Sequence, residues 1–113
     1  MTKDERAYEM IHHLKHFNGR MTRSAMANAM EMDDRSVRQT KQYINSNDDL
    51  FEDYFIVSTS DESGYKLADS PEELYRFVFE QQAKIRTMQI INDKAMRTKE
   101  KLDEKRNQAQ DSN

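Results

Sequence analysis

The sequence predicts a mainly α-helical protein with a small β-hairpin, an α+β chain, and three observations support this class. Only two glycines and one proline interrupt the 113 residues, so few tight turns and much helix are expected. Apolar residues recur at helical spacing in several segments. A single segment, "YFIVSTS" at residues 54–60, is aromatic and β-branched and therefore predicts a strand.

The composition excludes several classes of protein. The absence of cysteine excludes disulfides and thiolate metal sites. No apolar run approaches the ~20 residues of a membrane span, and "MTKDERAYEM" lacks the apolar stretch of a signal peptide, so we expect a soluble, cytoplasmic protein. The net charge of −3 hides an uneven distribution: residues 20–42 hold five basic and three acidic side chains, whereas residues 43–70 hold one and seven. A local positive face is therefore compatible with the acidic average.

The first helix is predicted to begin at Thr2, which forms a capping box with Glu5. Asn18-Gly19 is a typical C-terminal stop. Between these signals one apolar stripe follows helical spacing, made of Ala7, Met10, Ile11, Leu14 and Phe17.

A short second helix is predicted from its N-cap Thr22 to about Met30. Met21 and Met26 occupy the positions of a hydrophobic staple. A small, close-packing face is expected from Ala25, Met26, Ala29 and Met30.

The third helix follows the tight connection Glu31-Met32, with Asp33 or Asp34 as its cap. Steps of about 100° per residue place Val37, Thr40 and Ile44 on one buried face. The same steps place four polar side chains on the opposite face, with Tyr43 at its edge and Lys41 at its margin. These four are Arg35, Arg38, Gln39 and Gln42.

An acidic loop, "NSNDDLFED", leads into the hairpin. Its strands are predicted at 54–60 and 65–68, joined by the turn "DESG", in which Gly64 can take a positive φ.

A long helix is predicted over residues 70–106, followed by a disordered tail at 107–113. Ser70 caps it, and Pro71 occupies its first position. Alternating steps of four and three form a heptad register with the polar interruptions Gln81, Asn92 and Lys99. We expect this register to mediate oligomerisation through Leu74, Val78, Ile85, Met88, Asn92, Ala95 and Leu102.

The order helix, helix, turn, helix, hairpin, long helix resembles a winged helix-turn-helix domain at residues 1–69. The stretch "MTRSAMANAMEMDDRSVRQTKQYIN" is similar to that family's small second helix, tight turn and recognition helix, and "FIVSTSDESGYKL" is similar to its wing. The appended helix resembles the tails of small phage and prophage winged-helix proteins, which often belong to early or replication-related gene clusters.

Two positions depart from the pattern. Glu31 stands where the turn usually has glycine, which costs about 1 kcal/mol in a left-handed turn, and Asp61 and Glu62 stand where a wing usually carries basic residues.

The resemblance implies sequence-specific binding of double-stranded DNA by a homodimer or higher oligomer, as a transcriptional regulator or a replication-module protein. Side chains on the third helix would contact base edges: Arg35, Ser36, Arg38, Gln39 and Gln42. Contacts to phosphate would come from Thr22, Arg23, Ser24, Lys41, Tyr43 and Lys66. The alternative is a winged-helix scaffold that binds another protein and no DNA, which the acidic wing and loop favour.

No enzyme, cofactor or metal site is predicted. His12 and His16 are four residues apart, but zinc needs three or four protein ligands. The acidic cluster from Asp48 to Asp53 lacks the pattern of a calcium loop. The sequence also lacks a nucleophile elbow, a phosphate loop and a nuclease motif.

Overall fold

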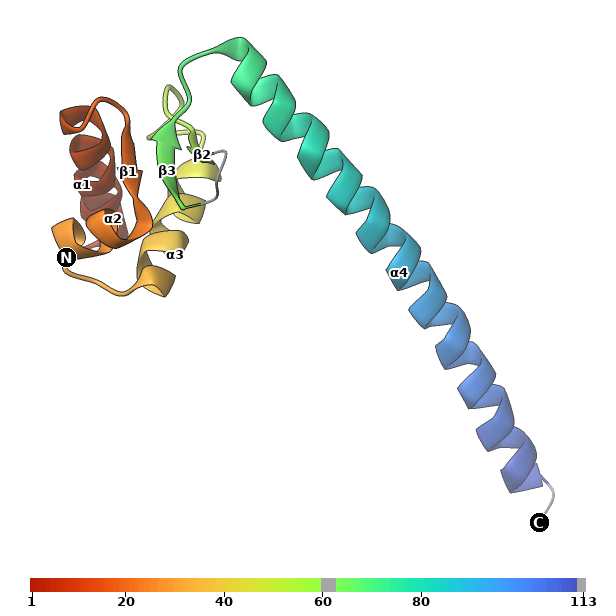
Figure 1. Ribbon diagram of the computed structural model, residues 1–113. Coiled ribbons are helices and arrows are strands. Elements are labelled where there is room, and N and C mark those ends of the chain that lie inside the picture. The colour runs from red at the N-terminus through yellow and green to blue at the C-terminus, as the bar shows by residue number, and fades with distance from the viewer. Residues whose placement is uncertain (60–62, 112–113) are drawn as a thin grey trace. The chain divides into compact units, whose positions relative to one another are not determined.

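The computed structural model describes residues 1–59 and 63–111 and shows a mainly helical chain with a small antiparallel sheet (Figure 1). The predicted wing tip with Asp61 and Glu62, and the last two residues of the predicted tail, lie outside the described residues. The chain divides into two units, which meet between Glu73 and Leu74. Its elements are α1 (Lys3–His16), β1 (Arg20–Thr22), α2 (Arg23–Met30), α3 (Asp34–Asn45), β2 (Ile56–Ser58), β3 (Gly64–Leu67) and α4 (Pro71–Asp111).

The sheet has three strands in the order β1-β3-β2, not the two of the predicted hairpin. β1 pairs with β3 by placing Met21 opposite Tyr65. With three residues between a helix stop and a helix cap, β1 is too short to show a strand pattern in the sequence. The prediction for Gly64 was also wrong, because Gly19 is the glycine with positive φ among the described residues. Gly64 is needed for close approach instead, since a Cβ there would lie 2.3 Å from the Met21 carbonyl oxygen.

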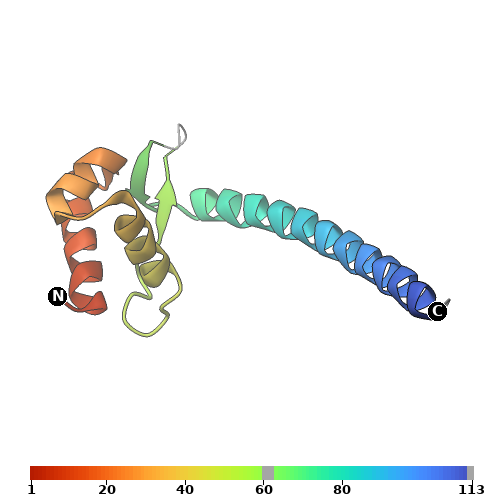
Figure 2. The same cartoon turned by 90° about the horizontal axis from the view of Figure 1, so that it is seen from below.

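The core of the N-terminal unit lies between α1, α2, α3 and the sheet, which pack side by side (Figures 1 and 2). The predicted stripe of α1 is buried as far as Leu14 but not at Phe17, which is 52% exposed. Phe17 fails to join the core because α1 ends at His16, and the following Asn18 and Gly19 take positive φ. Ala25 of α2 is exposed as well, whereas Met26 and Met30 are buried.

The loop between α3 and β2 is held by one buried aromatic residue. Phe51 is 2% exposed and makes edge-on ring contacts with Tyr8 and Tyr43, at centroid distances of 5.0 and 6.1 Å. The Asn45 side-chain amide also makes two hydrogen bonds to the Ile56 backbone. It donates to the carbonyl at 2.8 Å and accepts from the N–H at 2.9 Å. These contacts fix the end of α3 to the start of β2.

α4 begins where the sequence predicts, and the Glu73 N–H donates to the Ser70 hydroxyl at 3.2 Å. It continues through residues 107–111, where a disordered tail was predicted, since no glycine or proline stops it there. From Tyr75 onward most of its apolar side chains are exposed. Over the described residues, no helix combines the length and apolar character needed to span a membrane.

Candidate functional site

The turn between α2 and α3 is built around a left-handed glutamate. Glu31 has φ 53° and ψ 46°, the conformation for which glycine is usually chosen. Its N–H donates to the Asn28 carbonyl at 3.2 Å, and the Met32 N–H donates to the Ala27 carbonyl at 3.1 Å. These bonds occupy carbonyls at the end of α2 that would otherwise lack partners. Glutamate in place of glycine therefore raises the conformational free energy of the turn but leaves its left-handed geometry unchanged.

Asp33 is the N-cap of α3, which resolves the choice between the two aspartates. The Ser36 N–H donates to the Asp33 carboxylate at 2.8 Å. Hydrogen bonding from Ser36, through its side chain first and its backbone second, lowers the pKa of Asp33. The negative charge also lies at the positive end of the helix dipole, where it is stabilised.

α3 divides into a buried face and an exposed face at the spacing expected from the sequence. Val37 and Ile44 are at most 1% exposed, and Thr40 is buried with its hydroxyl donating to the Ser36 carbonyl at 2.9 Å. The predicted outward side chains are all exposed: Arg35, Arg38, Gln39 and Gln42. Ser36, also predicted to contact bases, is partly buried at the first turn. We call the four exposed residues the α3 outer face.

Asp34 binds two arginines from different helices. Arg23, the first residue of α2, donates to both carboxylate oxygens, from Nε at 3.1 Å and Nη2 at 2.5 Å. Arg38, one turn further along α3, places its Nε 3.2 Å from Oδ2. The hydrogen bond from Arg23 is the main cause that lowers the pKa of Asp34, and Asp34 in turn raises the pKa of Arg23.

The three side chains of this cluster are 40–62% exposed, so water screens their attraction. Their main effect is therefore geometric. Asp34 joins the start of α2 to the start of α3 through Arg23, and the same carboxylate contacts Arg38.

Of the other predicted phosphate ligands at the start of α2, the Thr22 side chain has a backbone partner. The Thr22 hydroxyl accepts from the Ala25 N–H at 3.1 Å, as an N-cap does. The Arg23 N–H donates to the Ser63 carbonyl at 2.8 Å. Ser24 is exposed beside them.

The remaining three predicted phosphate ligands are engaged elsewhere. Lys66 of β3 binds Glu73 at 2.8 Å and Asp69 at 3.3 Å, and the bond to Glu73 is the main cause that raises its pKa. The Tyr43 hydroxyl donates to the carboxylate of Asp4 on α1, which raises the Tyr43 pKa.

Lys41 is half-buried, with its Nζ 3.2 Å from the Ser58 hydroxyl and 5.8 Å from the centre of the Tyr65 ring. The structure thus gathers the α3 outer face with Arg23 and Asp34, but separates Tyr43 and Lys66 from that group.

Sequence reasoning missed two features of this surface. The role of Asp34 was missed because its partner Arg23 is eleven positions away on another helix, a separation that no local pattern marks. Arg20 was missed because β1 was not predicted; it is exposed and paired in register with Lys66.

The two histidines with metal-ligand spacing, His12 and His16, have aromatic neighbours. Within residues 1–59 and 63–111, no three His, Cys, Asp or Glu side chains come together as ion ligands. His16 contacts the Phe17 ring at a centroid distance of 5.1 Å, and His12 contacts His13 at 6.0 Å.

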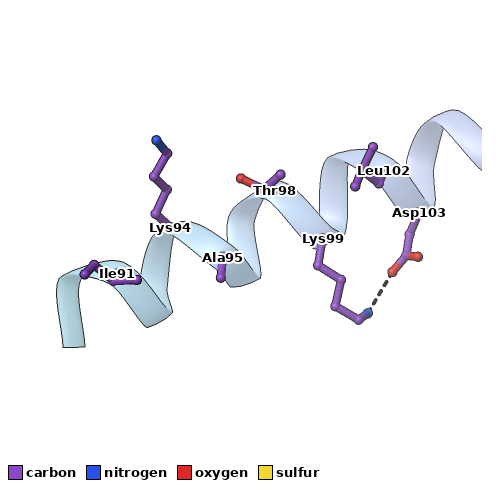
Figure 3. Close-up of a pocket in the computed structure, with 7 residues that line it drawn as sticks. All are labelled: Ile91, Lys94, Ala95, Thr98, Lys99, Leu102 and Asp103. Carbon is purple, nitrogen blue, oxygen red and sulfur yellow. Dashed lines mark hydrogen bonds and ion pairs between the residues drawn. The ribbon is translucent and has the colours of Figure 1, made fainter. Parts of the chain in front are cut away.

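α4 carries a second surface, which is exposed along its length. The predicted heptad residues Val78, Ile85, Met88 and Leu102 are 51–64% exposed. One surface hollow of the same helix is lined by Ile91, Lys94, Ala95, Thr98, Lys99, Leu102 and Asp103 (Figure 3).

No protein-family model matches the chain, and no curated protein or solved structure matches it either.

Proposed function

We propose that residues 1–69 form a winged helix-turn-helix domain that binds double-stranded DNA sequence-specifically through the α3 outer face. The protein acts as a homo-oligomer, in transcriptional regulation or in a replication module of a phage or bacterium. One observation carries the proposal: α3 buries Val37, Thr40 and Ile44 and exposes two arginines and two glutamines on its other side. The element order through β3 agrees with the resemblance found in the sequence.

The α3 outer face has the chemistry for contacting base edges. The major groove of B-DNA is about 12 Å wide and accepts an α-helix. An arginine can donate two hydrogen bonds to guanine, and a glutamine can both donate to and accept from adenine. Arg35 lies in the first turn of α3, where a recognition helix most often contacts bases. Asp34 supports this role by restraining Arg38 before DNA is bound.

We expect fewer phosphate contacts than the six ligands proposed from the sequence. Arg23 and Lys66 already bind carboxylates, so each would have to leave a partner to reach phosphate. Arg20, which is exposed on β1, adds a cation that was not predicted. With about two or three cationic contacts, log K should fall with log salt at a slope of roughly −2 to −3.

The test compares two double variants of the full chain by fluorescence anisotropy on a duplex selected from random sequences. Arg35→Ala with Arg38→Ala removes two cations from α3, and Lys3→Ala with Arg6→Ala removes two exposed cations from α1. The α3 pair should weaken binding by roughly 10- to 100-fold or more, whereas the α1 pair should change it by less than about threefold. Equal losses of affinity in both variants would show that the effect comes from net charge alone. Unchanged binding by the α3 pair would refute the proposal.

The alternative is a protein-binding domain without affinity for DNA. The Asp34 carboxylate favours it, because it binds Arg23 and Arg38 and so lowers the positive potential near α3. It predicts no retention of DNA even at about 50 mM salt, where electrostatic binding is strongest.

A further inference from the structure

We propose that α4 pairs with α4 of a second copy as a parallel, in-register, two-stranded coiled coil in which Asn92 meets Asn92. This inference deepens the oligomerisation part of the proposed function by giving strand number, direction and register. It stands on the residues of α4 and needs no DNA.

The heptad positions of α4 match the pattern that favours two strands. Numbering Leu74 as position d places β-branched Val78 and Ile85 at position a. Leucine and methionine occupy d at residues 74, 88 and 102. β-branched residues at a with leucine at d favour parallel dimers over trimers and tetramers. These side chains are exposed in the single chain, so they are available to a partner.

Asn92 selects the direction of pairing. In a parallel coil each layer pairs a residue with its copy, so the Asn92 amides meet and each can donate to and accept from the other. An antiparallel pair that covers the whole span from Leu74 to Leu102 would place Asn92 against Met88 and leave the amide unsatisfied. Shifting that pair by one heptad would place Asn92 against Gln81 but bring Lys99 onto Leu74 and leave Leu102 uncovered. The parallel register satisfies Asn92 and covers every apolar layer.

The inner positions a and d of α4 form the seam of the proposed coiled coil. The charges at positions e and g, beside this seam, allow a second copy to be the partner. In a parallel pair each g position faces the e position five residues further along the other chain. The facing pairs join Phe77 to Gln82, Lys84 to Gln89, Ile91 to Met96, and Thr98 to Asp103. None brings like charges together, so the e and g positions of two identical chains do not repel each other. The one like-charge layer of this span is Lys99 against its own copy.

Lys99 is the one charged residue at an inner position of this span, and the helix itself compensates it. Its Nζ lies 2.7 Å from Asp103 Oδ2, the bond drawn as a dashed line in Figure 3. Asp103 is at position e, on the margin of the seam. The bond draws the ammonium away from the seam, while the aliphatic stem of Lys99 remains to pack.

The hollow in Figure 3 has the form that such packing requires. In a coiled coil each inner side chain enters a space between four residues of the facing helix. Ala95, Thr98, Lys99 and Leu102 are four residues of this kind, and all of them line the hollow. In the parallel register the side chain that would enter between these four residues is Lys99 of the second copy, whose aliphatic stem could pack against the small Ala95.

Cysteine cross-linking tests direction and register, because the chain has no cysteine of its own. Leu102→Cys places sulfur at position d, and Lys101→Cys places it at the outward position c. Under a glutathione redox buffer the Leu102→Cys chain should form a disulfide dimer, and the Lys101→Cys control should remain at least tenfold less cross-linked. Cross-linking of Val78→Cys with Leu102→Cys chains, without a Leu102→Cys homodimer, would show antiparallel pairing and overturn the proposal.

A second measurement tests strand number and the role of Asn92. Light scattering at micromolar concentration should give a dimer for the unaltered chain, and a monomer would overturn the pairing. Asn92→Leu should shift the population to trimers or larger assemblies, whereas Thr87→Leu at the outward position c should leave the dimer intact. A strict dimer in Asn92→Leu would overturn the role of Asn92. Because none of these measurements uses DNA, failure of the coil and failure of DNA binding are distinguishable.

Discussion

The N-terminal unit buries many of its apolar side chains, whereas α4 exposes most of its own. Met10, Leu14 and Met26 are 0% exposed in the N-terminal unit, whereas Ile85 and Met88 of α4 are 61% and 64% exposed. Both regions satisfy their backbones with helical hydrogen bonds, but one of them also encloses a core. A helix gains most of its stability in water from burying an apolar face. The first unit is therefore stabilised within one chain, whereas the exposed apolar side chains of α4 are those that the proposed pairing would bury.

The largest expected effect is a break in the core of the first unit. Leu14→Ala should lower the free energy of unfolding by about 2–5 kcal/mol, because it removes a fully buried side chain and leaves a cavity. Leu50→Ala is the control, since that leucine is 48% exposed and should change stability by less than about 0.5 kcal/mol. Urea unfolding followed by circular dichroism measures both. Equal effects would contradict the assigned core.

The next-largest effect is expected in the self-association of α4 and not in the stability of the N-terminal unit. Ile85→Ala should weaken self-association by about 2 kcal/mol or more, a shift of roughly 30-fold, because each dimer loses two inner side chains. Unfolding of the N-terminal unit should not change. Ile90→Ala is the matched control, since Ile90 is equally exposed at 62% but lies off the heptad line. Sedimentation equilibrium would detect the difference, and equal weakening by both variants would argue against the seam.

Acid should affect the start of α3 through its two aspartates. Each has a pKa below the ordinary 3.8, so each contributes stability that is present above 3.8 and is lost as pH falls through its lowered pKa. Asp33→Asn keeps an effective N-cap but cannot titrate, so its stability should fall less steeply in acid. Asp48→Asn, which removes a carboxylate from the following loop, serves as control. Indistinguishable acid slopes for Asp33→Asn and the unaltered chain, by circular dichroism from pH 6 to 2, would count against the capping role.

The smallest effect concerns Asp34. Asp34→Asn removes the charge that restrains Arg23 and Arg38, so binding to random-sequence DNA should strengthen by a few-fold. The salt slope should become steeper by about one as Arg23 becomes available to phosphate. Discrimination between the selected duplex and random DNA should fall, because Arg38 loses its restraint. Anisotropy titrations at several salt concentrations measure these quantities. An unchanged slope would show that Arg23 never reaches phosphate.

Local signals were sufficient to predict where the helices begin. The caps Thr2, Thr22, Asp33 and Ser70 each accept the backbone hydrogen bond expected of them. The outward set on α3 was also predictable, because helical spacing alone separates it from Val37 and Ile44.

Features that depend on distant partners were not predictable. β1 exists because β3 pairs with it, and Phe51 is buried because Tyr8 and Tyr43 come together around it. The Asp34 cluster and the engagement of Lys66 likewise join residues from different elements. Such contacts decide which side chains remain available to a ligand, and a periodic pattern in the sequence does not record them.

Selection of bound duplexes from a random-sequence pool tests the central claim most directly. The account predicts an enriched sequence for the full chain, arranged as two inverted half-sites because a parallel pair has two-fold symmetry. The Arg35→Ala/Arg38→Ala variant should fail to enrich that sequence. Absence of any enriched sequence for the unaltered chain, or the same enriched sequence with the double variant, would contradict DNA recognition by α3.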